Sequence, residues 1–360
     1  MTAADAEPLA LPASTVPDPA TAPALRWAVI GPGGIARHFS RTLHAATASR
    51  VVAAASRSRD RAKAFAADVL GPDAASSSIS PFDSIPAMLE AGGVDAVYVA
   101  SPHAQHAEHA LAAIEAGFPV LVEKAFARNA AEARQVLDAA RARGVLAMEA
   151  MWTRFLPQSD VLRQVVSAGM LGELVLVRAD HGQHFDVDDS HRLRAPELAG
   201  GALLDLGVYP LSFAQMLLGD LSDLAATGSL TSTGVDADAI VLARGASGAH
   251  AILDSTQRTR TATTAEVAGT HGTARLSGPF YAPGSLTVSL HDGRTATFEH
   301  PGHRDRGMAY EAAEFARRFT AGETESPLMP WSDTLSVMEA MDEVRAQLGV
   351  VFPGEKGNAR

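Results

Sequence analysis

Short apolar runs alternate with helical patterns over the first 150 residues of the chain. Each predicted helix lies between two predicted strands, which is typical of a parallel, doubly wound sheet. The predicted strands are 26–30, 51–55, 94–100, 120–122 and 145–148, and the predicted helices are 35–46, 59–69, 105–116 and 129–143. The pattern therefore predicts an α/β fold class and a first domain over residues 25–149.

The pattern changes after residue 149. Strand-like runs with turn signals then follow one another with few helices between them, which favours a largely antiparallel, open sheet. The predicted strands are 174–180, 239–242, 249–253, 263–268, 285–290 and 295–298, and the predicted helices are 155–167, 202–218, 310–321 and 333–348. Residues 150–360 are predicted to form a second, α+β domain that binds the substrate.

Composition narrows the function classes. The chain has 360 residues, a net charge of −11 and no block of basic residues, so a nucleic-acid partner is not expected. No cysteine is present, which excludes disulfides, thiolate metal sites and a cysteine nucleophile and fits a reducing compartment such as the cytoplasm. No apolar run is expected to span a membrane. Residues 1–24 are rich in Pro and Ala and are predicted to be a disordered extension, with a docking arm as the alternative.

A glycine-rich turn joins the first predicted strand to the first predicted helix. Its pattern is Gly31-x-Gly33-x-x-Ala36. Glycines in this position let the backbone approach a pyrophosphate, and the following helix N-terminus carries partial positive charge. The turn therefore predicts a dinucleotide site that includes Gly31, Gly33, Gly34, Ile35 and Ala36. The alternative is a tight turn without a ligand.

The end of the second predicted strand indicates which dinucleotide is bound. Enzymes that use NAD usually place an acidic residue about twenty residues past the glycines, and here no acid occurs before Asp60. Ser56, Arg57 and Arg59 suit a ribose 2′-phosphate instead. We therefore predict NADP as cofactor, with NAD as the alternative. Arg57 and Arg59 could equally form a solvated helix start.

Candidate proton-handling residues lie in both predicted domains. Glu123 and Lys124 follow a parallel strand, at the sheet edge where ligands bind in open α/β folds. Asp205 and Tyr209 are four residues apart, so a helix would place them on one face, and Pro210 is expected to kink that helix. Lysine, aspartate and tyrosine can together move a proton. The alternatives are a surface lysine, a capping aspartate and a core tyrosine.

Histidines form two groups along the sequence. His103 and His106 flank the start of one helix and, with Ser101, Pro102, Glu123 and Lys124, complete the predicted cofactor contacts. The other group, His181, His184 and His191, shares a loop with three aspartates, but its irregular spacing is a poor metal signature, so no metal is predicted. His184 is predicted to contact the substrate. Arg192 is predicted to reach the substrate, or to pair with the loop acids.

These motifs together resemble the Gfo/Idh/MocA oxidoreductases. The resemblance covers residues 28–355 and rests on the glycine turn, Ser101-Pro102, Glu123-Lys124 and the run from Gly200 to Pro210. Residues 148–157 and 325–330 are most similar to the dimeric dihydrodiol dehydrogenase and NADP-dependent D-xylose dehydrogenase branch. The family usually reads Glu-Lys-Pro where this chain has Glu123-Lys124-Ala125.

The resemblance implies a Rossmann domain and a second domain whose open sheet often joins subunits, so a homodimer or higher homo-oligomer is expected. It implies that Lys124, Tyr209 and Asp205 are catalytic, that Arg57 contacts the 2′-phosphate, and that Trp152 and Arg154 join the substrate contacts. We expect an NADP(H)-dependent dehydrogenase acting on a sugar or vicinal diol. Alternatives are a keto-sugar or anhydro-sugar reductase, an NADP(H)-binding sensor without activity, and an enzyme that retains its cofactor to shuttle hydride between sugars.

Overall fold

A computed structural model describes residues 8–71, 78–302 and 304–355. Two compact units divide these residues, and each is described by itself. The parallel-sheet unit comprises residues 17–71, 78–151 and 305–335. The mixed-sheet unit comprises residues 8–16, 152–302, 304 and 336–355.

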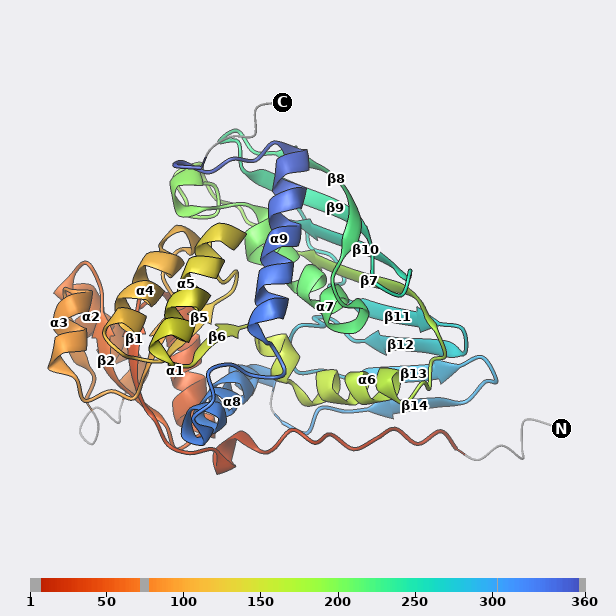
Figure 1. Ribbon diagram of the computed structural model, residues 1–360, viewed down its shortest axis with the longest axis horizontal. Coiled ribbons are helices and arrows are strands. Elements are labelled where there is room, and N and C mark those ends of the chain that lie inside the picture. Colours follow the sequence, from red (N-terminus) through yellow and green to blue (C-terminus); the bar gives the residue numbers. More distant parts are fainter. Residues whose placement is uncertain (1–7, 72–77, 303, 356–360) are drawn as a thin grey trace. The chain divides into compact units, whose positions relative to one another are not determined.

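The parallel-sheet unit contains a six-stranded sheet in the order β3-β2-β1-β4-β5-β6. Figure 1 labels β1, β2, β5 and β6 of this sheet. All neighbouring strands are parallel, which confirms the predicted α/β fold. Its strands are β1 (Arg26–Ile30), β2 (Arg50–Ala55), β3 (Ser80–Phe82), β4 (Ala96–Val99), β5 (Val120–Glu123) and β6 (Ala147–Ala150). The strand order reverses between β1 and β4, which is where open α/β sheets bind ligands.

Helices cover this sheet and supply most of the aromatic core. They are α1 (Gly34–Ala46), α2 (Arg59–Leu70), α3 (Ile85–Ala91), α4 (His106–Glu115), α5 (Ala130–Arg143) and α8 (Met308–Ala321), with short 3-10 turns η1 (Pro19–Thr21), η3 (His103–Gln105) and η7 (Arg304–Arg306). Asn129 caps α5 by accepting the Glu132 backbone N–H at 2.9 Å. Phe315 of α8 packs on Trp27 of β1, so a late segment of the chain completes this unit.

The mixed-sheet unit contains an eight-stranded sheet in the order β14-β13-β12-β11-β7-β10-β9-β8. Only the β7–β10 pair is parallel, so the sheet is largely antiparallel, as predicted. The strands are β7 (Leu174–Gly182), β8 (Ser222–Leu230), β9 (Asp236–Arg244), β10 (His250–Thr256), β11 (Ala265–Gly269), β12 (Gly272–Leu276), β13 (Leu286–Leu290) and β14 (Thr295–Phe298).

One face of this sheet is covered and the other is open. Helix α7 packs on β7 and β10. Along β9 the side chains alternate, so that Val241 is buried while its neighbours Ile240 and Leu242 are each 50% exposed. The helical segments of the unit are η4 (Trp152–Phe155), α6 (Pro157–Ser167), η5 (Pro196–Leu198), a π-helical turn η6 (Leu203–Gly207), α7 (Val208–Leu218) and most of α9 (Trp331–Leu348).

The stretch Pro196–Leu218 is long and apolar enough to pass a length-and-composition test for a membrane span, with a mean hydropathy of 1.3. The expectation that no apolar run reaches that length was therefore wrong. However, 89% of the stretch is buried inside the protein, which is the position of a core helix in a folded domain.

Residues 8–24 make specific contacts with the rest of the protein, so the predicted disordered extension was wrong over this range. Within the mixed-sheet unit, the Thr15 backbone N–H donates to Asp160 Oδ2 at 2.7 Å. Within the parallel-sheet unit, Pro19 is buried and the Arg317 guanidinium donates to the Asp18 carbonyl oxygen at 2.9 Å. Composition alone missed these contacts because they join residues far apart in sequence. The part of the predicted extension over residues 1–7 lies outside the described residues.

Candidate active site

The glycine turn lies against the loop that follows β4. Gly31 has a left-handed φ of +80°, and a Cβ built on it would lie 2.6 Å from the Ser101 backbone nitrogen. Only glycine allows this close approach of two backbones. The turn therefore brings the ends of β1 and β4 together at the point where the strand order reverses.

The next two glycines face open space. A Cβ on Gly33 would meet no atom closer than the Gly31 carbonyl oxygen at 3.9 Å, and one on Gly34 would meet nothing within 4 Å. Gly33 is the N-cap of α1 and has no side chain to bind the first N–H groups of the helix. These residues thus form a cradle that fits a cofactor pyrophosphate. Of the other predicted contacts, Ile35 is 43% exposed whereas Ala36 is fully buried.

The end of β2 presents positive charge on the same side. Arg57 and Arg59 are exposed, and Ser56 is half-buried. The Gly31 N–H donates to the carbonyl oxygen of Ala55, the last residue of β2, at 3.2 Å, so the segment that carries Arg57 leaves the sheet beside the glycine turn. Burial lowers the pKa of His109, while the Glu108 charge raises it and the Arg57 charge lowers it. His109 Nδ1 is in turn 2.9 Å from the Ser101 Oγ. Arg57 is therefore close to the glycine turn, where it can bind a 2′-phosphate.

His106 supports the loops and is a poor candidate for a direct cofactor contact. It is 1% exposed, its Nε2 lies 2.7 Å from the Ser101 carbonyl oxygen, and its Nδ1 lies 2.9 Å from the Ala125 carbonyl oxygen. The ring thus ties the loop after β4 to the loop after β5. His103, 7% exposed, packs edge-on against it with 5.5 Å between the ring centroids. Pro102 is the N-cap residue of the η3 turn.

The Glu123-Lys124 pair divides into a buried and an accessible residue. Glu123 is 5% exposed; the Tyr98 hydroxyl donates to its Oε1, and its Oε2 accepts the Lys124 backbone N–H at 3.2 Å. Burial raises the pKa of the fully buried Glu311, with the Glu123 charge as a further cause. Lys124 is half-buried, and its peptide bond to Ala125 is cis. Glu123 therefore holds the backbone of Lys124, and its predicted cofactor contact stays a prediction.

In the mixed-sheet unit, Asp205 and Tyr209 come from consecutive helical segments. Asp205 lies in the π-helical turn η6 and Tyr209 in α7, and both are 8% exposed. The structure has this π-helical turn just before Pro210. Pro210 has no N–H for the Leu206 carbonyl oxygen four residues earlier, and His181 Nδ1 lies 3.2 Å from that oxygen.

Four aromatic rings meet at Tyr209. Its ring stacks on Tyr281 with 4.7 Å between centroids and packs edge-on against His181 at 5.2 Å. The Tyr209 hydroxyl oxygen accepts a hydrogen bond from the Trp152 indole N–H at 3.2 Å. The sequence reasoning found Trp152 and Tyr209 but missed Tyr281, which follows a Gly-Pro turn with no motif of its own, and it gave His181 no role beyond the histidine-rich loop.

Asp236 is another residue that the sequence did not reveal. It is 1% exposed, its Oδ2 accepts the Leu203 N–H at 2.5 Å, and burial raises its pKa to about 6. A Cβ on Gly201 would lie 2.2 Å from its Oδ1. The Gly200-Gly201 pair of the sequence motif thus makes room for a carboxylate that caps the segment bearing Asp205.

The predicted substrate contacts differ in position. Arg192 Nη1 lies 3.9 Å from Asp205 Oδ1, so the arginine pairs with a predicted catalytic residue. His184 is exposed, with its Nδ1 3.0 Å from the Arg258 carbonyl oxygen. Arg154 is 2% exposed, and its guanidinium donates to the Ser212 carbonyl oxygen and to the Gln215 Oε1, so it anchors the η4 turn. Its predicted substrate contact stays a prediction. Among the described residues, no three His, Asp or Glu side chains are grouped to hold a metal.

Known protein families match residues in both units of the chain. Residues 25–151 match the model of an oxidoreductase family with an NAD-binding Rossmann fold, and residues 160–275 match the GFO/IDH/MocA C-terminal domain. The chain is 32% identical to D-xylose 1-dehydrogenase (NADP(+)) of Hypocrea jecorina, over 91% of this chain and 93% of the relative. It is 34% identical to trans-1,2-dihydrobenzene-1,2-diol dehydrogenase of Bos taurus, over 92% and 99%.

A solved structure is also similar along most of the chain. It is a 3-ketoreductase from Actinomadura kijaniata in complex with NADP and TDP-benzene, with a TM-score of 0.75 and 29% identity, covering 90% of this chain and 98% of that one. The similarity therefore extends across both units and is not confined to the dinucleotide-binding part.

Proposed function

Because the chain belongs to the Gfo/Idh/MocA family of oxidoreductases, we propose that it transfers hydride between NADP(H) and a hydroxyl or carbonyl carbon of a sugar or vicinal diol. The observation that carries the proposal is the open cradle at Gly33 and Gly34, beside the end of β2 that leads to Arg57. The similar proteins are named as a D-xylose dehydrogenase, a dihydrodiol dehydrogenase and a 3-ketoreductase, and these names support a sugar or diol as the substrate.

The cofactor and the protein have separate tasks in the proposed reaction. Bound NADP⁺ supplies the hydride acceptor for oxidation of the substrate carbon. The protein has to receive the hydroxyl proton, and we assign that role to Tyr209, whose oxygen already accepts a hydrogen bond. The Lys124 ammonium stabilises the negative charge that develops on oxygen. Asp205 balances the charge of Arg192 and orients it, at 3.9 Å.

Turnover across a substrate panel tests the proposal. Purified protein should reduce NADP⁺ with at least one aldose or vicinal diol, or oxidise NADPH with a keto-sugar. Lys124→Ala and Tyr209→Phe should each lower turnover by about 10²- to 10⁴-fold, the typical effect of losing a positioned acid or base. Their affinity for NADP should change little. Tight NADP binding with no turnover on any substrate of the panel would contradict an enzymatic function.

We also propose that a second copy of the chain covers the open face of the mixed sheet. Ile240, Leu242 and Ile252 are 50%, 50% and 37% exposed there, and Leu242 pairs with Ile252 across β9 and β10. Exposed apolar side chains that adjoin one another mark interaction surfaces. Leu242→Glu should convert an oligomer to monomers in light scattering, and a wild-type monomer would refute the assignment.

A cytoplasmic location stays a prediction, supported by a sequence of 360 residues without cysteine. Fractionation of the source cells followed by immunoblotting would test it. Recovery of the protein outside the cytoplasmic fraction would show the prediction to be wrong.

A further inference from the structure

We infer that Trp152 is a positioning residue for Tyr209: its indole N–H holds the tyrosine oxygen and favours the ionised, proton-accepting form of this side chain. This inference rests on the proposed function, in which Tyr209 receives the substrate proton. It gives Trp152 a role different from the substrate contact that its sequence position suggested. Its basis is the hydrogen bond of 3.2 Å between Trp152 Nε1 and the Tyr209 hydroxyl oxygen.

The chemistry of the two groups fixes the direction of this bond. An indole nitrogen can only donate, so the Tyr209 oxygen is the acceptor whatever its protonation state. A donor strengthens its bond when the acceptor oxygen becomes negative, and a hydrogen bond to a charged form favours that form. When Tyr209 receives a proton from a substrate hydroxyl, the oxygen changes from phenolate to phenol and the indole bond weakens. Trp152 thus lowers the pH at which Tyr209 becomes a competent base.

A neighbouring side chain fixes the turn that carries Trp152 to the helix that carries Tyr209. The Arg154 guanidinium donates to the Ser212 carbonyl oxygen at 2.9 Å and to the Gln215 Oε1 at 2.5 Å. Ser212 and Gln215 follow Tyr209 by three and six residues in α7, so they lie near it along the helix. The buried arginine therefore holds η4 in a fixed position on α7. Trp152 is thus already placed to bond the tyrosine oxygen.

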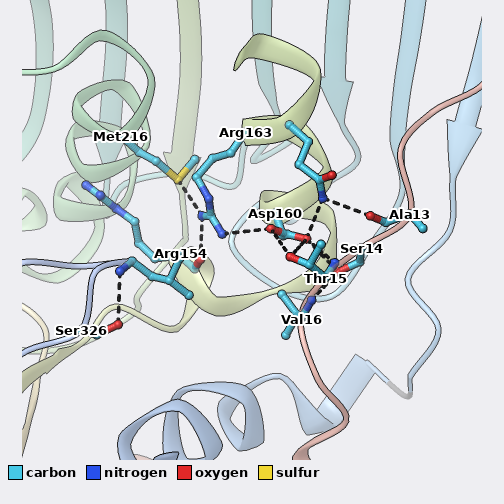
Figure 2. A network of polar contacts seen from close by, with 11 residues as sticks. Ala13, Ser14, Thr15, Val16, Arg154, Asp160, Arg163, Met216 and Ser326 are labelled. Atoms are coloured by element: carbon cyan, nitrogen blue, oxygen red, sulfur yellow. Dashed lines mark hydrogen bonds and ion pairs between the residues drawn. The ribbon is translucent and has the colours of Figure 1, made fainter. Parts of the chain in front are cut away.

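A second layer of polar contacts supports the turn, and Figure 2 shows it from close by. The Arg163 guanidinium donates to the Arg154 carbonyl oxygen at 2.8 Å and lies 3.8 Å from Asp160. Asp160 in turn accepts from the Thr15 backbone N–H. These contacts link the extended segment before residue 17 to the η4 turn, within one unit of the protein.

Aromatic rings pack against Tyr209, which is 8% exposed. Tyr281 stacks on the Tyr209 ring with an interplanar angle of 29°, and His181, 1% exposed, packs on the same ring. The Tyr281 carbonyl oxygen is held by the Thr153 hydroxyl at 3.0 Å, so this ring is tied to the same turn as Trp152. A hydrogen bond to a charged oxygen is stronger in such an apolar setting.

The substitution Trp152→Phe tests the inference, because it keeps a large ring and removes the N–H group. We expect the midpoint of the pH–rate profile for NADP⁺-dependent oxidation to move upward by about one unit, the equivalent of a hydrogen bond to a charged group. The KM for NADP⁺ should stay unchanged. Trp331→Phe is the matched control: its indole N–H donates to the Ala147 carbonyl oxygen in the other unit, so its loss should not move the midpoint.

A titration that does not depend on turnover separates this inference from the proposed function. The chain has four tyrosines, and the difference in ultraviolet absorbance between wild type and Tyr209→Phe isolates the ionisation of Tyr209. That ionisation should also shift upward by about one unit in Trp152→Phe. An unchanged ionisation would overturn the inference even if the enzyme is active. Conversely, the expected shift in Tyr209 ionisation, found in a protein that turns over no substrate, would support the inference and contradict the proposed function.

A conservative variant covers the case in which Trp152→Phe does not fold. Trp152→His keeps a ring N–H and should hold the ionisation of Tyr209 closer to the wild-type midpoint than Trp152→Leu does. Equal midpoints in the histidine and leucine variants would overturn the inference, because the ring N–H would then have no effect.

Discussion

The Asp236 carboxylate accepts the backbone N–H of Leu203, with 2.5 Å between Oδ2 and the nitrogen. Leu203 opens the π-helical turn that carries Asp205 and leads into α7. The helix that bears two proposed catalytic residues thus begins at a buried carboxylate on a neighbouring strand. Gly201 makes this possible, because a Cβ there would meet the same carboxylate at 2.2 Å.

This relationship predicts the effect of removing the cap. Asp236→Ala should lower the free energy of unfolding by about 1–3 kcal/mol, because it removes the acceptor of the buried Leu203 N–H. Turnover should fall further than NADP affinity, since the segment carries Asp205 and lies outside the parallel-sheet unit. Urea denaturation and steady-state kinetics would measure both. Asp236→Asn is the matched control, because it keeps an oxygen acceptor; an equal loss in both variants would argue against the cap.

The glycine turn predicts opposite outcomes for two neighbouring glycines. Gly31→Ala should destabilise the protein even without cofactor, because its φ is +80° and its Cβ would clash with the Ser101 backbone. Gly33→Ala should fold with near wild-type stability and lose NADP affinity, because its Cβ points into the cradle. Thermal denaturation and fluorescence titration with NADPH separate the two effects. Unaltered NADPH affinity in Gly33→Ala would place the pyrophosphate elsewhere.

The exposed Arg57, which follows β2, is expected to make the protein prefer NADP⁺ to NAD⁺. Arg57→Ala should lower kcat/KM for NADP⁺ by about 10- to 100-fold, the equivalent of losing charge-assisted hydrogen bonds to a phosphate. The value for NAD⁺ should stay nearly constant. Arg61→Ala, an exposed arginine of α2, is the control for a general loss of positive charge. Equal use of both cofactors by the wild type would remove the basis for this prediction.

The contacts of residues 8–16 predict that Asp160 holds this segment. Asp160→Ala removes the acceptor of the Thr15 backbone N–H and of the Ser14 hydroxyl, so the free energy of unfolding should fall by about 1–3 kcal/mol. Proteolysis before residue 17 should become faster in the native protein. Mass spectrometry of limited digests would locate the cuts. The exposed Asp220, changed to Ala, serves as the control.

His44 predicts a pH dependence of stability. Its Nε2 accepts the Val51 N–H at 2.9 Å, and burial, with the Arg50 charge, lowers its pKa to about 4 from 6.5. Between these values the unfolded chain binds more protons than the folded one, so stability is lost as the pH falls from 6.5 to 4. His44→Asn should show a shallower decline in urea denaturation at stepped pH. A decline as steep as that of the control His271→Asn would contradict this role.

The hydrophobic patterns were sufficient to predict most of the alternating strands and helices. Elements with a weak hydrophobic pattern were not predicted. β3 contains only Ser80, Pro81 and Phe82, and β8 is an edge strand whose residues are mostly exposed, so neither carries a marked apolar signal. Gly272–Leu276 is short and begins with glycine. These segments become strands because a neighbouring strand offers hydrogen-bond partners, and a single sequence does not contain that information.

The candidate site shows the same division between local and distant information. Gly31 and Lys124 could be predicted because each stands at a recognisable place beside a strand. Asp236 and Tyr281 could not, because their importance comes from contacts with Leu203 and Tyr209, which are far away along the chain. The contacts of Arg154 with Ser212 and Gln215 could not be predicted either, since sequence does not reveal which way a side chain points.

The return of residues 305–335 to the parallel-sheet unit has a consequence for engineering. A chimera made with a single crossover near residue 151 would separate β1 from α8, and Trp27 would lose the Phe315 ring that packs on it. Exchanging the parallel-sheet unit with that of a relative therefore requires junctions at four places, near residues 16, 151, 304 and 335. Recombination libraries built on this chain should respect all four.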